Sequence, residues 1–246
     1  MGGEVRYDAR KLVRMLASME RRGLWSSGVL GSEPLAVRDG QLIMKYYGLE
    51  YKVPFHMLVE GGRFYPSIIH MEYDVDVHGK VVLDVGAFTG DSALYFISRG
   101  ASRVIAIEPV PEHFEILRLN AEDLPVMPIN AAVGCEVPYI PELIGRGLYG
   151  IKEVIRSRKG KLNVPVLSLS DLAESNRPQV VKVDCEGCEH YLVNELAKLK
   201  EIGVETLIIE LHPVPNKTAE ELLNELAVLL GNPDKIIVRN ARGGIK

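Results

Sequence analysis

The chain has 246 residues, of which 47% are apolar and 25% charged, and its formal net charge is -4. This balance suits a globular protein and argues against a mainly electrostatic grip on nucleic acid, although it leaves room for a local basic patch. No apolar run approaches the roughly 20 residues that a membrane-spanning helix needs, the N-terminus lacks the apolar core of a secretory signal, and three cysteines indicate no disulfide framework. We therefore expect a soluble cytoplasmic protein that has no membrane partner.

The N-terminal part of the sequence predicts a small extension to a larger domain. Apolar positions at helical spacing predict a surface helix over residues 5–22. Two β-rich runs in residues 35–48 flank Asp39 and Gly40, a pair that favours a tight I′ turn, so we expect a β-hairpin there. Residues 49–73 show no regular pattern.

From Lys80 onward, strand-like and helix-like runs alternate. We predict helices over residues 91–99, 112–120, 191–200 and 218–230, between the strand-like runs VVLDVG, RVIAIEP, VMPINAAV, VVKVDCEG, VETLIIEL and KIIVRN. Continuous Val, Ile and Leu strands between amphipathic helices predict an α/β fold with a doubly wound, mostly parallel sheet. Ligands bind at the carboxyl ends of the strands in such sheets, where Asp84, Glu108, Asp184 and Glu210 all fall.

The turn after the first of these strands is the first candidate site. Gly86 and Gly90 allow a tight turn, and the helix behind them offers free N–H groups to an anionic group. Glu108 lies 22 residues after Gly86, near the spacing of a carboxylate that binds a ribose diol. The spacing G-x-x-x-G, with Asp84 just before it, fits an amine-bearing ligand such as S-adenosylmethionine better than a dinucleotide. A glycine turn that only joins a strand to a helix is the plain alternative.

Several short motifs in the same order resemble the FkbM-type S-adenosylmethionine-dependent methyltransferases. These motifs are VVLDVGAFTGDSALYF, RVIAIEPVPEHFEILRLN, INAAVG, LSLSDL, VVKVDCEGCEHYLV and LIIELH, and the resemblance runs from about residue 72 to 212. It implies a class I methyltransferase (Rossmann-like) fold, with residues 76–246 as the S-adenosylmethionine-binding catalytic domain and residues 1–75 as the helix and hairpin extension. It also implies methylation of hydroxyls on sugars or other small molecules.

The resemblance assigns roles position by position. Asp84, Gly86 and Gly90 would cradle the methionine side of the cofactor, and Glu108 would bind the ribose. The implied cofactor-binding set is Glu72, Asp84, Gly86, Ala87, Phe88, Gly90, Glu108, Pro109, Asn130 and Ala131, with the last two residues near the adenine. The C-terminus departs from the family, because only one strand-like run is evident where an antiparallel pair is usual. The missing strand is either supplied from elsewhere or absent.

Three residues at later strand ends are candidates for catalysis. Asp184 would face the methyl group and orient or deprotonate the acceptor, while Glu210 and His212 share a face because they lie two residues apart. Histidine is a plausible proton acceptor near neutral pH. The run CEGCEH invites a metal interpretation through Cys185, Cys188 and His190, with His212 as a fourth ligand, but the second ligand pair of a structural zinc site is missing from the sequence. We expect core thiols and no metal.

Two segments are candidates for acceptor recognition. Residues 145–162 carry six basic residues against one acid and could cover an anionic acceptor or form a solvated helix. The aromatic residues of the N-terminal 75 could contact an acceptor or a second copy in a homodimer. The leading interpretation is a methyltransferase for a small-molecule or glycan hydroxyl. An RNA methyltransferase and a non-enzymatic nucleoside-binding module remain as alternatives.

Overall fold

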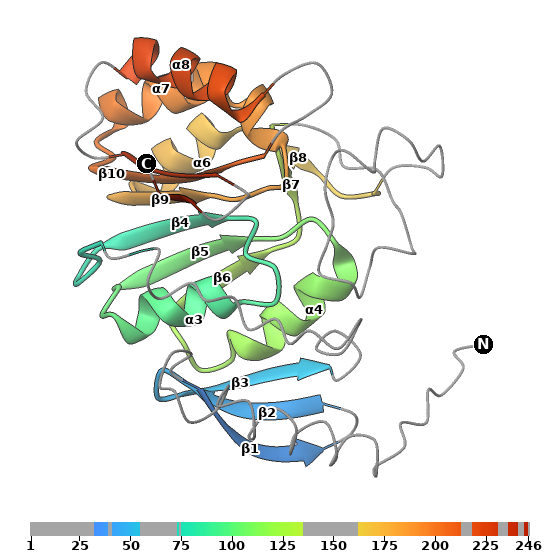
Figure 1. Ribbon diagram of the computed structural model, residues 1–246. Helices are drawn as coiled ribbons and strands as arrows, with labels where there is room; N and C mark the ends of the chain where they lie inside the picture. Colours follow the sequence, from blue (N-terminus) through green and yellow to red (C-terminus); the bar gives the residue numbers. More distant parts are fainter. Residues whose placement is uncertain are drawn as a thin grey trace.

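The computed structural model arranges its described residues in four layers, in which the two larger sheets alternate with two sets of helices (Figure 1). It describes residues 32–38, 41–54, 73, 75–134, 162–212, 218–230, 236–240 and 244–245. The helix predicted over residues 5–22 and nearly all of the basic segment 145–162 lie outside these residues. Within the described part of the chain, no helix has the length and apolar character that crossing a bilayer requires.

A seven-stranded sheet forms the central layer, in the order β12-β11-β10-β9-β4-β5-β6. Its strands are β4 (Val81–Val85), β5 (Arg103–Ile107), β6 (Val126–Ile129), β9 (Val180–Val183), β10 (Thr206–Leu211), β11 (Ile236–Asn240) and β12 (Gly244–Ile245). All neighbours from β6 to β11 pair in parallel, which confirms the predicted sheet. The chain builds β4, β5 and β6 outward and then returns to place β9 beside β4. The topological switch point therefore lies between β4 and β9.

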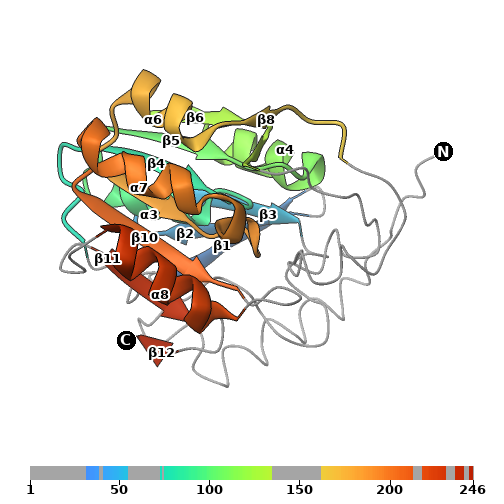
Figure 2. The same cartoon turned by 90° about the horizontal axis from the view of Figure 1, so that it is seen from above.

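Helices cover both faces of this sheet, as a doubly wound fold requires (Figure 2). One face carries α3 (Asp91–Ser98) and α4 (Pro111–Asn120), and the other carries α6 (Leu169–Asn176), α7 (Val193–Ile202) and α8 (Ala219–Leu230). Alternation along the strands divides the core accordingly. In β4, Val82 packs toward α3 whereas Leu83 packs toward α7 and α8.

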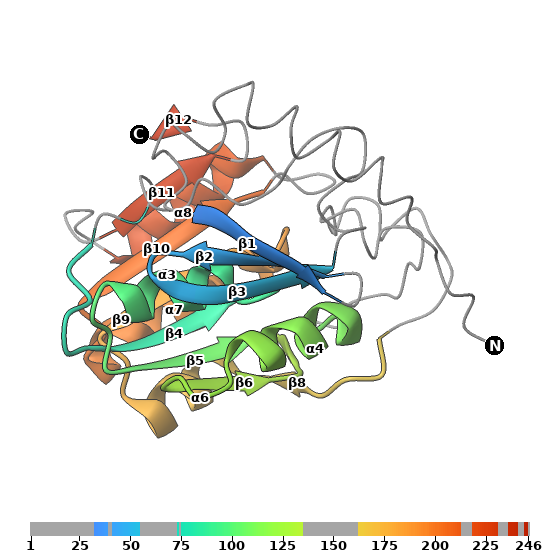
Figure 3. The ribbon, with the colours of Figure 1, turned by 90° about the horizontal axis from the view of Figure 1, so that it is seen from below.

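A three-stranded antiparallel sheet packs against α3 and α4 (Figure 3). Its strands are β1 (Ser32–Arg38), β2 (Gln41–Tyr46) and β3 (Leu49–Pro54). The pairing of β1 with β2 confirms the predicted hairpin. The expectation that no regular structure follows residue 48 is wrong, because β3 pairs with β2 there. Tyr47 and Gly48, both at positive φ, make a two-residue turn of the I′ kind, and in β3 Tyr51 and Val53 are buried while Glu50 is exposed.

The far edge of the central sheet differs from the sequence-based expectation of a single final strand. β11 pairs in parallel with β10, and the short β12 pairs antiparallel with β11 through Arg239 and Ile245. The second strand is thus supplied by the last residues of the chain. Two residues are too few to show a strand period, so the sequence pattern could not indicate it.

Three short elements complete the described fold. β7 (Ala132–Val133) and β8 (Val166–Leu167) form a two-stranded parallel sheet, and a 3₁₀ turn, η2 (Cys188–Tyr191), precedes α7. The run VMPINAAV is therefore two strands and not one. Asn130 lies between them, next to the ends of β5 and β6.

Gly86 should tolerate alanine poorly, because β4 and β9 end in close contact there. A Cβ at Gly86 would lie 1.8 Å from the backbone oxygen of Asp184, and its φ of +78° already strains an L side chain. We expect Gly86→Ala to lower the free energy of unfolding by about 3 kcal/mol or more. Gly79→Ala, with a φ of +70° but nothing within 4 Å of its Cβ, is the control and should cost about 1 kcal/mol. Urea unfolding compares them, and equal losses would contradict the crowding at Gly86.

Candidate active site

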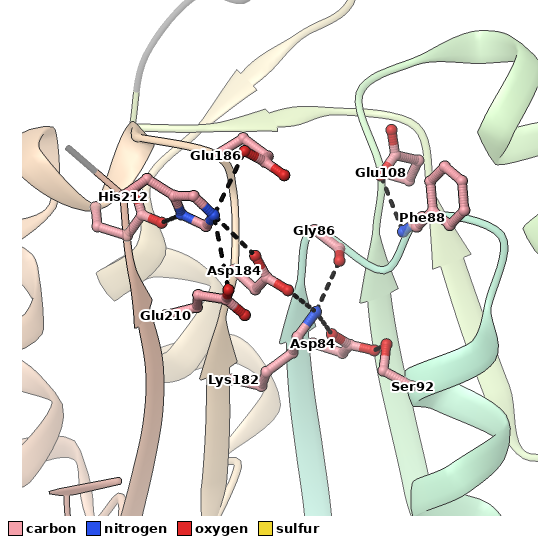
Figure 4. A network of polar contacts seen from close by, with 11 residues as sticks. Asp84, Gly86, Phe88, Ser92, Glu108, Lys182, Asp184, Glu186, Glu210 and His212 are labelled. Atoms are coloured by element: carbon pink, nitrogen blue, oxygen red, sulfur yellow. Dashed lines mark hydrogen bonds and ion pairs between the residues drawn. The ribbon is translucent and has the colours of Figure 1, made fainter. Parts of the chain in front are cut away.

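Charged side chains form a row across one face of the central sheet, at the carboxyl ends of its strands (Figure 4). Asp84 in β4 lies in register with Lys182 in β9, and Lys182 lies in register with Ile208 in β10. Glu210 follows Ile208 by two residues and so points to the same face. This is the α3 side of the sheet, and the row crosses the switch point between β4 and β9.

Lys182 is the centre of this row and was not among the residues predicted from the sequence. Its side chain is almost fully buried, and its ammonium group lies 3.1 Å from Oδ1 of Asp84 and 3.7 Å from Oδ2 of Asp184. It also donates a hydrogen bond of 2.8 Å to the backbone oxygen of Gly86. Burial opposes the charge, but Asp84 and other acids outweigh it and raise the pKa of Lys182 well above its usual value. A lysine within a strand of valines is a sequence feature that could have identified it, because buried lysines are almost always paired.

Asp84 lies beneath the glycine loop and has no exposed surface. Besides Lys182, it accepts a hydrogen bond of 2.5 Å from the hydroxyl of Ser92 in α3. Both partners belong to the chain itself, so the carboxylate ties the end of β4 to α3 and β9. A ligand amine could reach Asp84 directly only by entering this buried network.

The glycine loop is shaped by backbone contacts with the end of β5. The amides of Gly86 and Ala87 both bond to the oxygen of Ile107, and the amide of Phe88 donates to Oε2 of Glu108. Gly90 then begins α3 at a φ of +95°. Gly90 offers no side chain to cap this end of α3, and the first turn of the helix carries the buried Asp91.

Glu108 is fixed at the end of β5 by backbone donors. Its Oε2 accepts from the amide of Phe88 at 3.0 Å, and its Oε1 accepts from the amide of Val110 at 2.9 Å. The Nδ1 atom of His113 lies 3.4 Å from Oε1. The structure thus brings Glu108 to the glycine loop, as the spacing predicts.

Asn130, which the sequence predicts near the adenine, is bonded to the backbone at the end of β5. Its amide nitrogen donates to the backbone oxygens of Glu108 at 2.9 Å and Pro109 at 3.2 Å. Ala131 is fully buried in the same core cluster as Leu83, whereas Asn130 is half-buried. Glu72 lies outside the described residues.

His212, directly after β10, is surrounded by carboxylates (Figure 4). Its Nδ1 lies 2.7 Å from Oε1 of Glu189, and its Nε2 lies 3.4 Å from Glu186, 3.9 Å from Glu210 and 4.0 Å from Asp184. Burial opposes a charged ring, but the hydrogen bond to Glu189 and the surrounding negative charge raise the pKa of His212 to about 10. At neutral pH the ring is therefore a cation. A protonated ring cannot accept a further proton, so this state differs from the expected role of His212 as a proton acceptor.

Glu186 stands out among these carboxylates and was also missed from the sequence. Burial raises the pKa of Glu186 to about 7, and the charge of His212 moderates that rise. Its backbone has a φ of +57°, a conformation that few residues other than glycine adopt. Proximity to Asp184 in the motif DCEGCE was the only indication in the sequence.

Cys185 and Cys188 form a disulfide bond, so the expectation of free core thiols is wrong. The bond closes the turn that carries Glu186 and leads into η2. The sequence spacing alone does not distinguish a disulfide from a thiol pair. Among the described residues, no group of three or more His, Cys, Asp or Glu side chains could hold a metal ion.

Fold and site together define the class of this protein. A parallel sheet whose first strand leads through a glycine loop into a helix, with an acid at the end of the second strand, is the arrangement of class I methyltransferases. The family described as "Methyltransferase FkbM domain" matches residues 84–236, more than half of the chain. The chain belongs to this family.

Curated relatives carry a related description. A Clostridium tetani protein described as an uncharacterized RNA methyltransferase is 27% identical over 188 residues, which are 74% of this chain and 39% of the relative. A Clostridium acetobutylicum protein with the same description is 30% identical over 135 residues, 55% of this chain and 28% of the relative. The chain thus spans less than half of either. A solved structure from Streptococcus mutans, described as a candidate S-adenosylmethionine-dependent methyltransferase, has 11% identity and a TM-score of 0.47, covering 80% of this chain and 48% of that one.

Removing the charge of Lys182 should strongly destabilise the protein. We expect Lys182→Met to lower the free energy of unfolding by about 3–5 kcal/mol, because Asp84 then stays buried without its counter-ion. Adding Asp84→Asn should recover part of the loss.

Lys80→Met is the matched control for Lys182→Met. Lys80 pairs with the exposed Asp76 and Glu205, so its loss should cost about 1 kcal/mol or less. Chemical unfolding measures each variant. Similar losses in the two single variants would show that the pair beneath the loop contributes little.

Proposed function

We propose that this chain transfers a methyl group from S-adenosylmethionine to a hydroxyl group of an acceptor. The observation that carries the proposal is the family match, which begins at Asp84 and extends to the start of β11. It therefore includes the glycine loop and the charged ends of β5, β9 and β10. In this proposal the loop and Glu108 bind the cofactor, and the acids beyond β9 bind the acceptor.

The residues at the ends of β4 and β5 fit a nucleoside with a charged amino-acid tail. The glycine loop before α3 would lie against the charged tail of the nucleoside, with the buried Asp91 in the first turn of the helix. Glu108 is oriented by Phe88 and Val110 and retains lone pairs for a ribose diol. Asn130 would border the base. When bound, the cofactor supplies an electrophilic methyl group on a sulfonium.

The carboxylates beyond β9 are the proposed acceptor side. The chain must orient the hydroxyl and accept its proton as the methyl group is transferred. A cationic His212 cannot accept that proton at neutral pH, so the task falls to Asp184 or Glu186, both partly exposed. The pKa of Glu186, about 7, is well matched to proton transfer near neutral pH.

The chemistry of this side favours a small-molecule or sugar hydroxyl as the acceptor. Carboxylates accept hydrogen bonds from hydroxyls, as a polyol would offer. The same negative charges would repel the phosphates of a nucleic acid. Three carboxylates lie within about 4 Å of the Nε2 atom of His212 and Glu189 contacts its Nδ1 atom, whereas the cations that the described residues place beside them are the ring and Lys182, which also pairs with Asp84.

Asp184 provides the direct test of this arrangement. We expect the full chain to bind S-adenosylhomocysteine and not NAD in calorimetry, and to transfer labelled methyl to an acceptor from a panel of sugars and other hydroxyl compounds. Asp184→Asn should leave cofactor binding within about twofold and slow methyl transfer by about 100-fold or more. Asp171→Asn, at an exposed position in α6, is the control and should match the wild type. Full transfer by Asp184→Asn would remove Asp184 from the reaction, and failure to bind S-adenosylhomocysteine would refute the proposed cofactor.

RNA is the second candidate acceptor, because both clostridial relatives are described as RNA methyltransferases. An RNA methyltransferase should bind bulk RNA with an affinity that falls steeply between about 50 and 200 mM salt, and should label it. The favoured proposal predicts neither result. Binding of S-adenosylhomocysteine without transfer to any acceptor would instead indicate a nucleoside-binding module.

A further inference from the structure

Glu189 is a fully buried carboxylate to which the proposed reaction assigns no task. It lies in η2, and its Oε1 accepts a hydrogen bond of 2.7 Å from Nδ1 of His212. Its Oε2 atom has no hydrogen-bond partner among the described residues. Burying a carboxylate is costly unless an opposite charge compensates it, and His212 is the cation in contact with it.

The same turn also holds the backbone of His212. The ring of His190 bonds through Nε2 to the backbone oxygen of His212 at 2.7 Å. Two consecutive residues of η2 therefore contact His212, one at its ring and one at its main chain. The disulfide between Cys185 and Cys188 closes the turn immediately before them.

With Nδ1 bound to Glu189, the opposite nitrogen of His212 faces the acceptor side. Glu186 and Asp184 approach it from the segment after β9, and Glu210 approaches it from β10. Lys182 contacts Asp184 from the other side. Among the described residues, the ring and Lys182 are thus the positive groups next to these carboxylates, and the ring is the one in contact with Glu189.

We propose that Glu189 is a positioning residue that orients the ring of His212 and holds it as a cation among the carboxylates of the acceptor side. The cation offsets the mutual repulsion of these carboxylates and favours their ionised forms. It lowers the pKa of Glu186, which burial alone would raise further. A fraction of the Glu186 side chains therefore stays ionised at neutral pH and can accept a proton. This last consequence rests on the proposed methyl transfer, whereas the orientation and charge of His212 do not.

The charge of His212 can be measured without any activity. In NMR titrations of the full chain, with the ring signals assigned by His212→Gln, we expect the wild-type ring to stay protonated well above pH 6.5. Glu189→Gln keeps an acceptor for Nδ1–H but removes the charge, so the pKa of His212 should fall by about one unit or more. Glu189→Ala should lower it and also release the ring.

Glu205→Gln is the matched control, because Glu205 pairs with Lys80 before the start of β10, at the opposite end of that strand from His212. It should leave the titration of His212 unchanged. A wild-type ring that titrates near pH 6.5 would overturn the proposal, as would a Glu189→Gln variant whose His212 titrates like the wild type. If both Glu189 variants fail to fold, the wild-type titration still tests the charge of the ring, and a value near pH 6.5 still overturns the proposal.

The pH dependence of methyl transfer tests the consequence for the reaction. If the cation is required, activity is lost as pH rises through the pKa of His212, so Glu189→Gln should lose activity at a lower pH than the wild type. The midpoint of that loss should coincide with the NMR value of the same variant, a coincidence that a merely structural role would not produce. Loss at an unshifted pH would refute this role. Absence of transfer by the wild type would refute the proposed function and leave the NMR result standing.

Discussion

The contact between Lys182 and Asp84 is the interaction on which the arrangement of this site depends. It joins the two strands that flank the topological switch point, β4 and β9, and it is almost entirely hidden from water. Such a pair gains little net stability compared with apolar residues of the same volume. Its value lies in geometry, because the same ammonium group also binds the oxygen of Gly86 and approaches Asp184. The side chain of Lys182 thus fixes the position of the glycine loop relative to Asp184.

The site continues from Lys182 as an alternation of opposite charges. Asp84, Lys182, Asp184 and His212 follow one another in space, and further glutamates surround the histidine. Each cation lies between carboxylates that would otherwise repel one another, and burial strengthens both the attraction and the repulsion. The network therefore holds its groups in fixed positions without requiring a ligand to organise them. Prior organisation of this kind is what an enzyme needs where charge develops during a reaction.

How much the sequence could predict depended on how local each feature is. The glycine loop and the spacing to Glu108 are short-range patterns, and the structure brings those residues together as expected. Lys182 was recognisable as a charge within an apolar strand, although the pattern does not reveal its partners. The protonation of His212 could not be predicted, because it arises from carboxylates on the segment after β9 and on η2. The disulfide was equally hidden, since two cysteines three residues apart fit several chemistries.

The close approach of Gly86 to Asp184 explains why the two halves of the site cannot be arranged independently. Parallel strands place their carboxyl ends at one edge of the sheet, and at the switch point the chain turns away from β4 and β9 toward opposite faces. The two backbones remain in contact there, with no room for even a methyl group at residue 86. A cofactor seated on the loop and an acceptor held by Asp184 would therefore meet across a distance set by the backbone. In this fold, strand order thus fixes where the glycine loop and Asp184 lie relative to each other, and the proposed role of Glu189 is to set the charge of the His212 ring beside them.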